Sequence, residues 1–133
     1  HEKYLAQFQL ADLYLDTFIY NAGATASNAL WAGLPVLTKT GNSYASRMAS
    51  SLLMSIGLPE LITNTSSGYE KLALEISSEP ERLDSIKRKL HKNRLSKPLF
   101  NTKLFTTHLE EGYRIAYNRH RDGKEPAVIK VPM

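Results

Sequence analysis

The segment that most constrains the fold is a strand, helix and strand pattern near the amino end. Residues 12–16 and 34–38 are short, mainly apolar runs that predict strands, and residues 24–33 predict a helix between them. Gly33 suits the left-handed position that ends a helix, and Pro35 prevents its continuation. Two strands joined through a helix form a βαβ unit with parallel strands and a right-handed crossover. The chain is therefore expected to be an α/β protein.

The start of this helix has the features of an anion site. The first amides of a helix lack carbonyl partners and carry partial positive charge, so they favour a ligand such as a diphosphate. In open α/β sheets, ligands also bind beyond the carboxyl ends of the strands, where residues 20–28 belong. The pattern predicts a nucleotide or nucleotide-sugar site. Asp16, which ends the first strand, is expected to hydrogen-bond within loops, as is Asp12.

The remaining elements are mainly helical. Short runs predict a helix over residues 1–11, a helix capped by Ser43 and ended by Gly57, and a third strand at residues 61–62. Further helices are predicted over residues 69–76, 78–95 and 101–121.

Composition limits the functions that remain open. The chain has 133 residues, no cysteine and a net charge of +4, so disulfides and thiolate metal sites are excluded. Its four histidines lack metal-ligand spacing, and no metal is expected. No apolar run is long enough to span a membrane. Because the chain opens on His1 inside a helical pattern and supplies few strands, we expect a carboxy-terminal piece of a larger protein.

Five segments, in order, resemble the carboxy-terminal catalytic region of the O-linked N-acetylglucosamine transferase family, which includes SPINDLY-like proteins. They are residues 9–12 with 15–17, residues 21–33 ending in Leu-Trp-Ala-Gly, Gly41 with residues 45–47, residues 57–62, and residues 96–103.

This resemblance implies the Rossmann-like nucleotide-binding half of a GT-B glycosyltransferase, with a short parallel sheet, flanking helices and a long carboxy-terminal helix. The donor-binding domain would cover residues 1–121, incomplete at its amino end, and residues 122–133 would form a tail. The implied protein is cytoplasmic, carries tetratricopeptide repeats upstream, and transfers a sugar from a uridine diphosphate donor to Ser or Thr of proteins. Its implied partners are the donor, a protein acceptor and the missing amino-terminal lobe, without a cofactor. The 133-residue piece alone is expected to be inactive.

The resemblance also implies the site residues. Relatives read Asn-x-His-Thr-Thr-x-x-Asp at the helix start, with the His and Thr pair at the diphosphate and the Asp at the ribose. Relatives usually hold the uridine with a His and an Arg further upstream. The corresponding positions here are Gly23, Ala24, Thr25 and Asn28 at the helix start, and Tyr4 and Gln7 upstream. Thr25 alone keeps the family residue.

Two alternatives to a transferase remain open at this point. The substitutions at the helix start are also compatible with a degenerate transferase fold that serves as a scaffold or interaction module. Residues 87–97 carry the strongest run of positive charge, which is compatible with a polyanion-binding domain.

Overall fold

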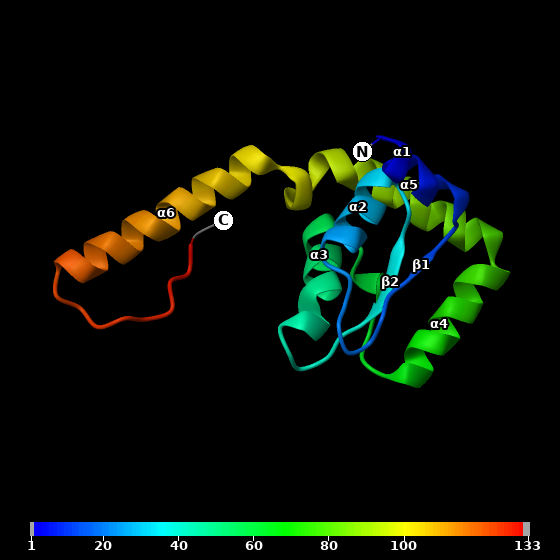
Figure 1. Cartoon of the computed structure of the whole chain (residues 1–133), viewed down its shortest axis with the longest axis horizontal. Helices are drawn as coiled ribbons and strands as arrows, with labels where there is room; N and C mark the ends of the chain where they lie inside the picture. The colour runs from blue at the N-terminus through cyan, green and yellow to red at the C-terminus, as the bar shows by residue number, and fades with distance from the viewer. Residues whose placement is uncertain (1, 132–133) are drawn as a thin grey trace. The chain divides into compact units, whose positions relative to one another are not determined.

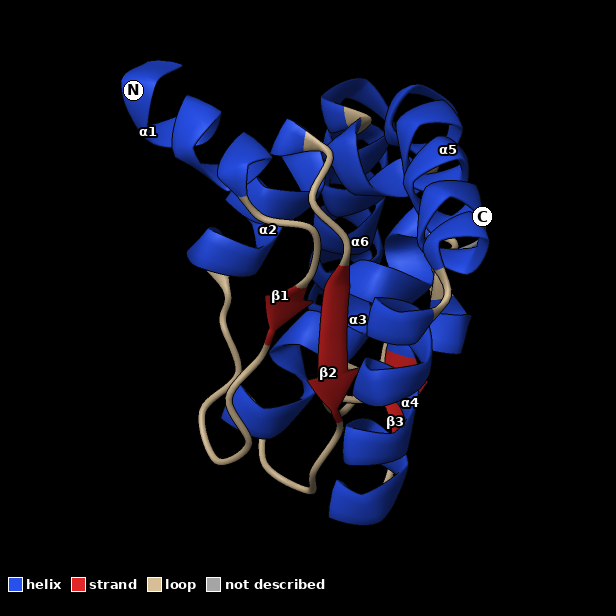
Figure 2. Ribbon diagram, turned by 90° about the vertical axis from the view of Figure 1, so that its right-hand side faces the viewer, coloured by secondary structure: helices blue, strands red, loops and turns tan. Residues whose placement is uncertain are grey.

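The centre of the molecule is a small parallel sheet. The computed structural model describes residues 2–131. Strands β1 (Tyr14–Leu15), β2 (Val36–Lys39) and β3 (Ile62–Thr63) lie side by side in the order β1-β2-β3, and both neighbouring pairs are parallel (Figure 2). The α/β prediction and the two predicted strands of the βαβ unit are confirmed. A third strand forms one residue later than predicted.

The register places the carboxyl ends of the strands at one edge of the sheet. Tyr14 pairs with Val36, and Thr38 pairs with Ile62. Because parallel strands run in one direction, the loops that follow β1 and β2 leave the sheet on the same side. Those two loops form the site described below.

Six α-helices are present in the described residues. They are α1 (Glu2–Gln7), α2 (Ala24–Ala32), α3 (Met48–Ile56), α4 (Ser66–Ser78), α5 (Pro80–Ser96) and α6 (Thr102–Arg121). In Figure 1, α2 and α3 lie on one side of the strands and α4 lies on the other. α5 packs against α2, α3 and α4. None of these helices combines the length and apolar character needed to cross a bilayer.

The chain divides into two compact units. The first ends at Leu99 and contains the whole sheet, whereas the second begins at Phe100 and contains α6. The core of the first unit is formed by fully buried aliphatic side chains from β2 and the surrounding helices, among them Leu30, Leu37, Leu53, Ile56 and Leu90. This core packs against the sheet and fixes the edge at which the candidate site, described below, lies.

Several predicted helix boundaries are wrong. α1 ends at Gln7 rather than at residue 11, because the chain continues as a 3-10 turn, and α5 begins at Pro80 rather than at residue 78. Side-chain hydrogen bonds explain two further differences. α4 begins at Ser66 rather than at residue 69, because the Thr65 side chain caps it by accepting from the Gly68 amide at 3.0 Å. Ser43 does not directly cap α3. Its hydroxyl accepts from the Ser46 amide at 3.2 Å, so a 3-10 turn over Ala45–Arg47 precedes the α-helix.

Candidate functional site: a pocket at the start of α2

A buried carboxylate organises the loop after β1. Asp16 follows the last residue of β1 and is only 3% exposed. Its Oδ1 accepts from the backbone amides of Thr17 at 2.9 Å and Ala22 at 2.8 Å, and its Oδ2 accepts from the Thr38 hydroxyl at 2.6 Å. These bonds fold the loop back on itself and tie it to β2. The predicted loop role of Asp16 is confirmed, whereas Asp12 instead forms an ion pair with Lys87 at 2.7 Å.

Tyr69 of α4 supports Asp16 from another direction. Its hydroxyl donates to the Asp16 backbone carbonyl at 3.0 Å, and its ring meets the Phe18 ring edge-on at a centroid distance of 4.8 Å. Burial, reinforced by the negative charge of Asp16, raises the pKa of Tyr69 to about 12. Tyr69 therefore remains a neutral hydrogen-bond donor throughout the physiological range.

Asn21 joins the loop after β1 to the loop after β2. Its backbone amide donates to the Ala45 carbonyl at 3.0 Å, and its Nδ2 donates to the Thr17 carbonyl at 2.7 Å. Asn21 is almost completely buried, with a relative exposure of 1%. Its Oδ1 has no hydrogen-bond partner within the described structure. A buried acceptor without a donor is uncommon and calls for an explanation.

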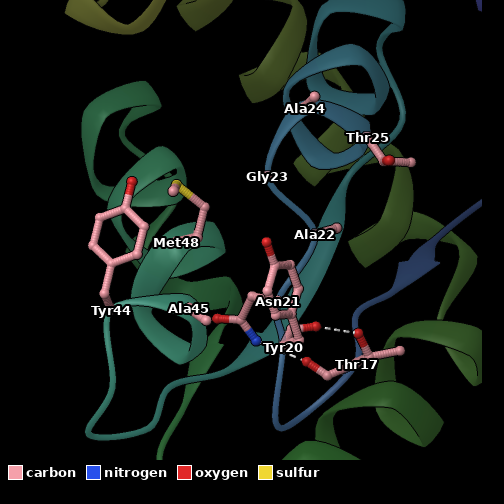
Figure 3. Close-up of a pocket in the computed structure, with 10 residues that line it drawn as sticks. All are labelled: Thr17, Tyr20, Asn21, Ala22, Gly23, Ala24, Thr25, Tyr44, Ala45 and Met48. Atoms are coloured by element: carbon pink, nitrogen blue, oxygen red, sulfur yellow. Dashed lines mark hydrogen bonds between the residues drawn. The ribbon is translucent and has the colours of Figure 1, made fainter.

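These two loops and the start of α2 enclose a pocket of about 380 Å³. Figure 3 shows the side chains that surround it. The lining residues are Thr17, Tyr20, Asn21, Ala22, Gly23, Ala24, Thr25, Tyr44, Ala45 and Met48. The pocket therefore lies beyond the carboxyl ends of β1 and β2, as ligand sites do in other open α/β sheets.

The start of α2 presents backbone donors to this pocket. The Ser27 amide donates to the Gly23 carbonyl at 3.0 Å in the first turn of the helix. The amides of residues 24–26 precede that bond and have no carbonyl of their own helix to pair with. No side chain caps this helix start. The arrangement suits an anion, because Ala24 and Thr25, which carry two of these amides, line the pocket at the positive end of the helix.

The structure brings together three of the six predicted site residues. Gly23, Ala24 and Thr25 line the pocket. Asn28 lies one turn further along α2, is half-buried and does not line it.

The other two predicted site residues lie on α1. Tyr4 and Gln7 are exposed and do not line the pocket. The Tyr4 ring meets the Phe8 ring edge-on at a centroid distance of 5.2 Å, and α1 packs against α2. The predicted roles of all six residues in ligand binding stay predictions.

Seven of the lining residues are not among the predicted site residues, namely Thr17, Tyr20, Asn21, Ala22, Tyr44, Ala45 and Met48. A signal for two of them was present, because Tyr20 and Tyr44 each stand in a loop that follows a predicted strand. Large aromatic residues in such loops are candidates for ligand contact. The pocket offers amides, hydroxyls and aromatic rings, and no cluster of metal-ligating side chains occurs in residues 2–131.

The fold is that of one Rossmann-like half of a GT-B protein, and a solved structure has the same architecture. A mutant of the O-GlcNAc transferase of Thermobaculum terrenum matches with a TM-score of 0.80 and 34% identity, over 86% of this chain and 22% of that chain. The model of glycosyl transferase family 41 matches residues 1–109, and the chain belongs to this family.

Two of the similar proteins come from plants. The chain is 32% identical over 131 residues to a probable UDP-N-acetylglucosamine–peptide N-acetylglucosaminyltransferase SPINDLY of Hordeum vulgare, covering 98% of this chain and 14% of that protein. It is 33% identical over 130 residues to the probable transferase SEC of Arabidopsis thaliana, covering 97% of this chain and 13% of that protein. The chain thus spans a small part of the length of these relatives. The resemblance to the family is confirmed.

Proposed function

We propose that this chain supplies the donor-diphosphate site of a protein O-glycosyltransferase that uses a uridine diphosphate sugar. Membership of the family supports this proposal, as do the relatives named for transfer of N-acetylglucosamine to peptides. The observation that carries it is the uncapped start of α2, which opens into a pocket beyond the carboxyl ends of β1 and β2.

In this proposal the start of α2 binds the diphosphate of the donor. Glycosyl transfer breaks the bond between the sugar and the diphosphate, so negative charge develops on the leaving uridine diphosphate. Amides of Ala24 and Thr25, together with the Thr25 hydroxyl, stabilise that charge because they are fixed in place before the reaction. Asn28 both donates to and accepts from a ribose hydroxyl, and Tyr4 and Gln7 contact the uridine.

Other parts of the proposal concern the full-length protein. The acceptor is a Ser or Thr hydroxyl of a protein, and the reaction requires an amino-terminal lobe and a tetratricopeptide array in the cytoplasm. The residue that removes the acceptor proton is not assigned to this chain, and no metal is assigned to the diphosphate.

The proposal is tested by the thermal stability of the full-length protein with ligand. A ligand that binds only the folded state at about 100 times its Kd stabilises by about 2.7 kcal/mol, which raises the melting temperature by several degrees. We expect this increase with uridine diphosphate and with uridine diphosphate N-acetylglucosamine, and a smaller one with uridine. Thr25→Val should reduce the increase, whereas Thr106→Val, which removes an exposed hydroxyl on α6, should not.

The opposite result would count against a donor site. A protein whose melting temperature does not change with either diphosphate at millimolar concentration does not bind the donor. RNA binding that falls with salt and with Lys-to-Glu changes in residues 87–97 would instead indicate a polyanion-binding domain.

A further inference from the structure

We propose that Tyr20 and Tyr44 form an aromatic pair that binds the glycosyl group of the donor and so sets the preference for that group. The inference rests on the proposed function, because it assigns a role to the part of the same pocket that the diphosphate leaves free. Neither residue is one of the six predicted site residues, although Tyr20 lies in the segment 20–28 that the sequence places beyond the strand ends.

The two tyrosines stand in equivalent places on neighbouring loops. Tyr20 lies in the loop after β1 and Tyr44 in the loop after β2, and both line the pocket. Their relative exposures are 75% and 76%, so each ring presents most of its surface to solvent. Figure 3 shows both side chains beside the pocket. Two large exposed rings at one pocket offer apolar surface that a ligand can cover.

Hydrogen bonds fix the backbone that carries the pair. The amide of Asn21, the residue after Tyr20, donates to the carbonyl of Ala45, the residue after Tyr44, at 3.0 Å. The Tyr20 carbonyl in turn accepts from the Thr17 hydroxyl at 2.5 Å. The two rings are therefore anchored at neighbouring points. A site whose backbone is set in advance loses less entropy when a ligand binds.

The position of the pair relative to the phosphate donors indicates which part of the ligand it meets. In Figure 3, Tyr44 and Met48 lie on one side of the Asn21–Gly23 segment and Thr25 extends on the other. The residues assigned to the uridine lie on α1, which does not line the pocket. A donor whose diphosphate sits at the start of α2 has two ends. The side of Tyr44, with Tyr20 next to the Asn21–Gly23 segment in Figure 3, is then left for the glycosyl end.

The chemistry of the pair suits a sugar. The C–H faces of a pyranose ring pack against an aromatic face, while its hydroxyl groups need polar partners. Tyrosine supplies both, because it combines an apolar ring with a hydroxyl that donates and accepts hydrogen bonds. Met48 adds an adaptable apolar side chain to the same side of the pocket. None of these three side chains is charged, so they add nothing to diphosphate binding by charge.

The test compares two ligands that differ only in the glycosyl group. Calorimetry on the full-length protein measures the Kd of uridine diphosphate and of uridine diphosphate N-acetylglucosamine. We expect the double change Tyr20→Ala and Tyr44→Ala to weaken binding of the sugar nucleotide about tenfold, which corresponds to about 1.4 kcal/mol, and to leave uridine diphosphate within about twofold. The double change to Phe keeps the rings and should retain most of the affinity. Tyr117→Ala, at an exposed tyrosine on α6 with a relative exposure of 65%, is the matched control.

Each other result has a defined meaning. An equal loss for both ligands would place the rings at the nucleoside or the phosphates and overturn the inference, and so would an unchanged Kd for the sugar nucleotide. If the unaltered protein does not bind uridine diphosphate, the proposed function fails, and this inference fails with it. The single Ala variants, checked by circular dichroism, give the same comparison if the double variant does not fold.

Discussion

The Thr38 hydroxyl donates to the Asp16 carboxylate at 2.6 Å, and this bond joins the end of β1 to the end of β2. Both side chains are buried, with relative exposures of 0% and 3%. The same carboxylate accepts two backbone amides of the loop that leads to α2. One side chain therefore determines where the start of α2 stands relative to the sheet.

Removing either partner of this bond should destabilise the protein. Thr38→Val keeps the side-chain shape and leaves Asp16 Oδ2 without a donor, which should lower the free energy of unfolding by about 1–3 kcal/mol. Asp16→Ala leaves three donors unpaired and should lower it further. Urea denaturation measures both effects, with Asp84→Ala, an exposed carboxylate on α5, as the control. A Thr38→Val protein as stable as the original would show that the bond does not hold the loop.

Two glycines that end helices should tolerate alanine to different degrees. Gly33 ends α2 with φ of 93°, and Gly57 ends α3 with φ of 74°, so alanine is strained at both positions by about 1–2 kcal/mol. A Cβ at Gly33 meets no atom within 4 Å, but one at Gly57 lies 3.0 Å from Asn93 Nδ2.

Gly57→Ala should therefore be the more destabilising change. Asn93 Nδ2 donates to the Ile56 carbonyl at 2.8 Å, and the added methyl group would disturb this buried bond. Melting temperatures of the two alanine variants give the comparison. Equal losses at Gly33 and Gly57 would mean that Asn93 moves aside without loss.

Because of Tyr69, the free energy of unfolding should vary with pH in the alkaline range. Its pKa is about 10.0 when unperturbed and about 12 in the folded protein, so its contribution is complete below pH 10 and is lost as the pH rises towards 12. Tyr69→Phe removes the bond to the Asp16 carbonyl and should lower the free energy of unfolding at pH 7 by about 0.5–1.5 kcal/mol.

The comparison that tests this is unfolding across pH 8–12. The difference in stability between the original protein and Tyr69→Phe should shrink as the pH rises above 10. Tyr113→Phe, an exposed tyrosine on α6, should show no such change. A difference that stays constant to pH 12 would contradict the raised pKa.

The βαβ unit was predictable because its signals are local. Apolar runs, small residues and Gly33 followed by Pro35 each act over a few positions, and they gave α2 and both of its strands nearly at their observed bounds. The loop role of Asp16 was also predictable, since a carboxylate after a strand has backbone amides nearby. Its partner Thr38, 22 residues away, was not predictable, because it depends on strand register.

The composition of the pocket was only partly predictable for the same reason. Gly23, Ala24 and Thr25 are consecutive at a helix start, so their shared position followed from one local pattern. Tyr44 and Met48 line the pocket from the segment that follows β2. The hydrogen bond from the Asn21 amide to the Ala45 carbonyl joins this segment to the loop after β1. Contacts of this kind have no periodic signal.

Restoring the residues that the family carries at the helix start should strengthen donor binding. A Cβ at Gly23 meets Met48 Cγ at 3.5 Å, an ordinary contact, so the position has room for a Cβ. Gly23→His with Ala24→Thr adds hydrogen-bond donors for a charged ligand, and each such hydrogen bond contributes about 1.5–3 kcal/mol. The double variant should therefore lower the Kd for uridine diphosphate at least about tenfold.

Calorimetry measures this change, and Asn42→His, in a loop position outside the pocket lining, is the control for an added imidazole. An unchanged Kd in the double variant would mean that the helix start does not meet the diphosphate.

Hydrogen–deuterium exchange of the full-length protein, with and without uridine diphosphate, tests the central claim most directly. Amides that donate to a bound phosphate exchange more slowly, so the account predicts slowed exchange in peptides that cover residues 21–28. Saturating ligand that leaves these amides unchanged, or that protects only residues 87–97, would contradict it.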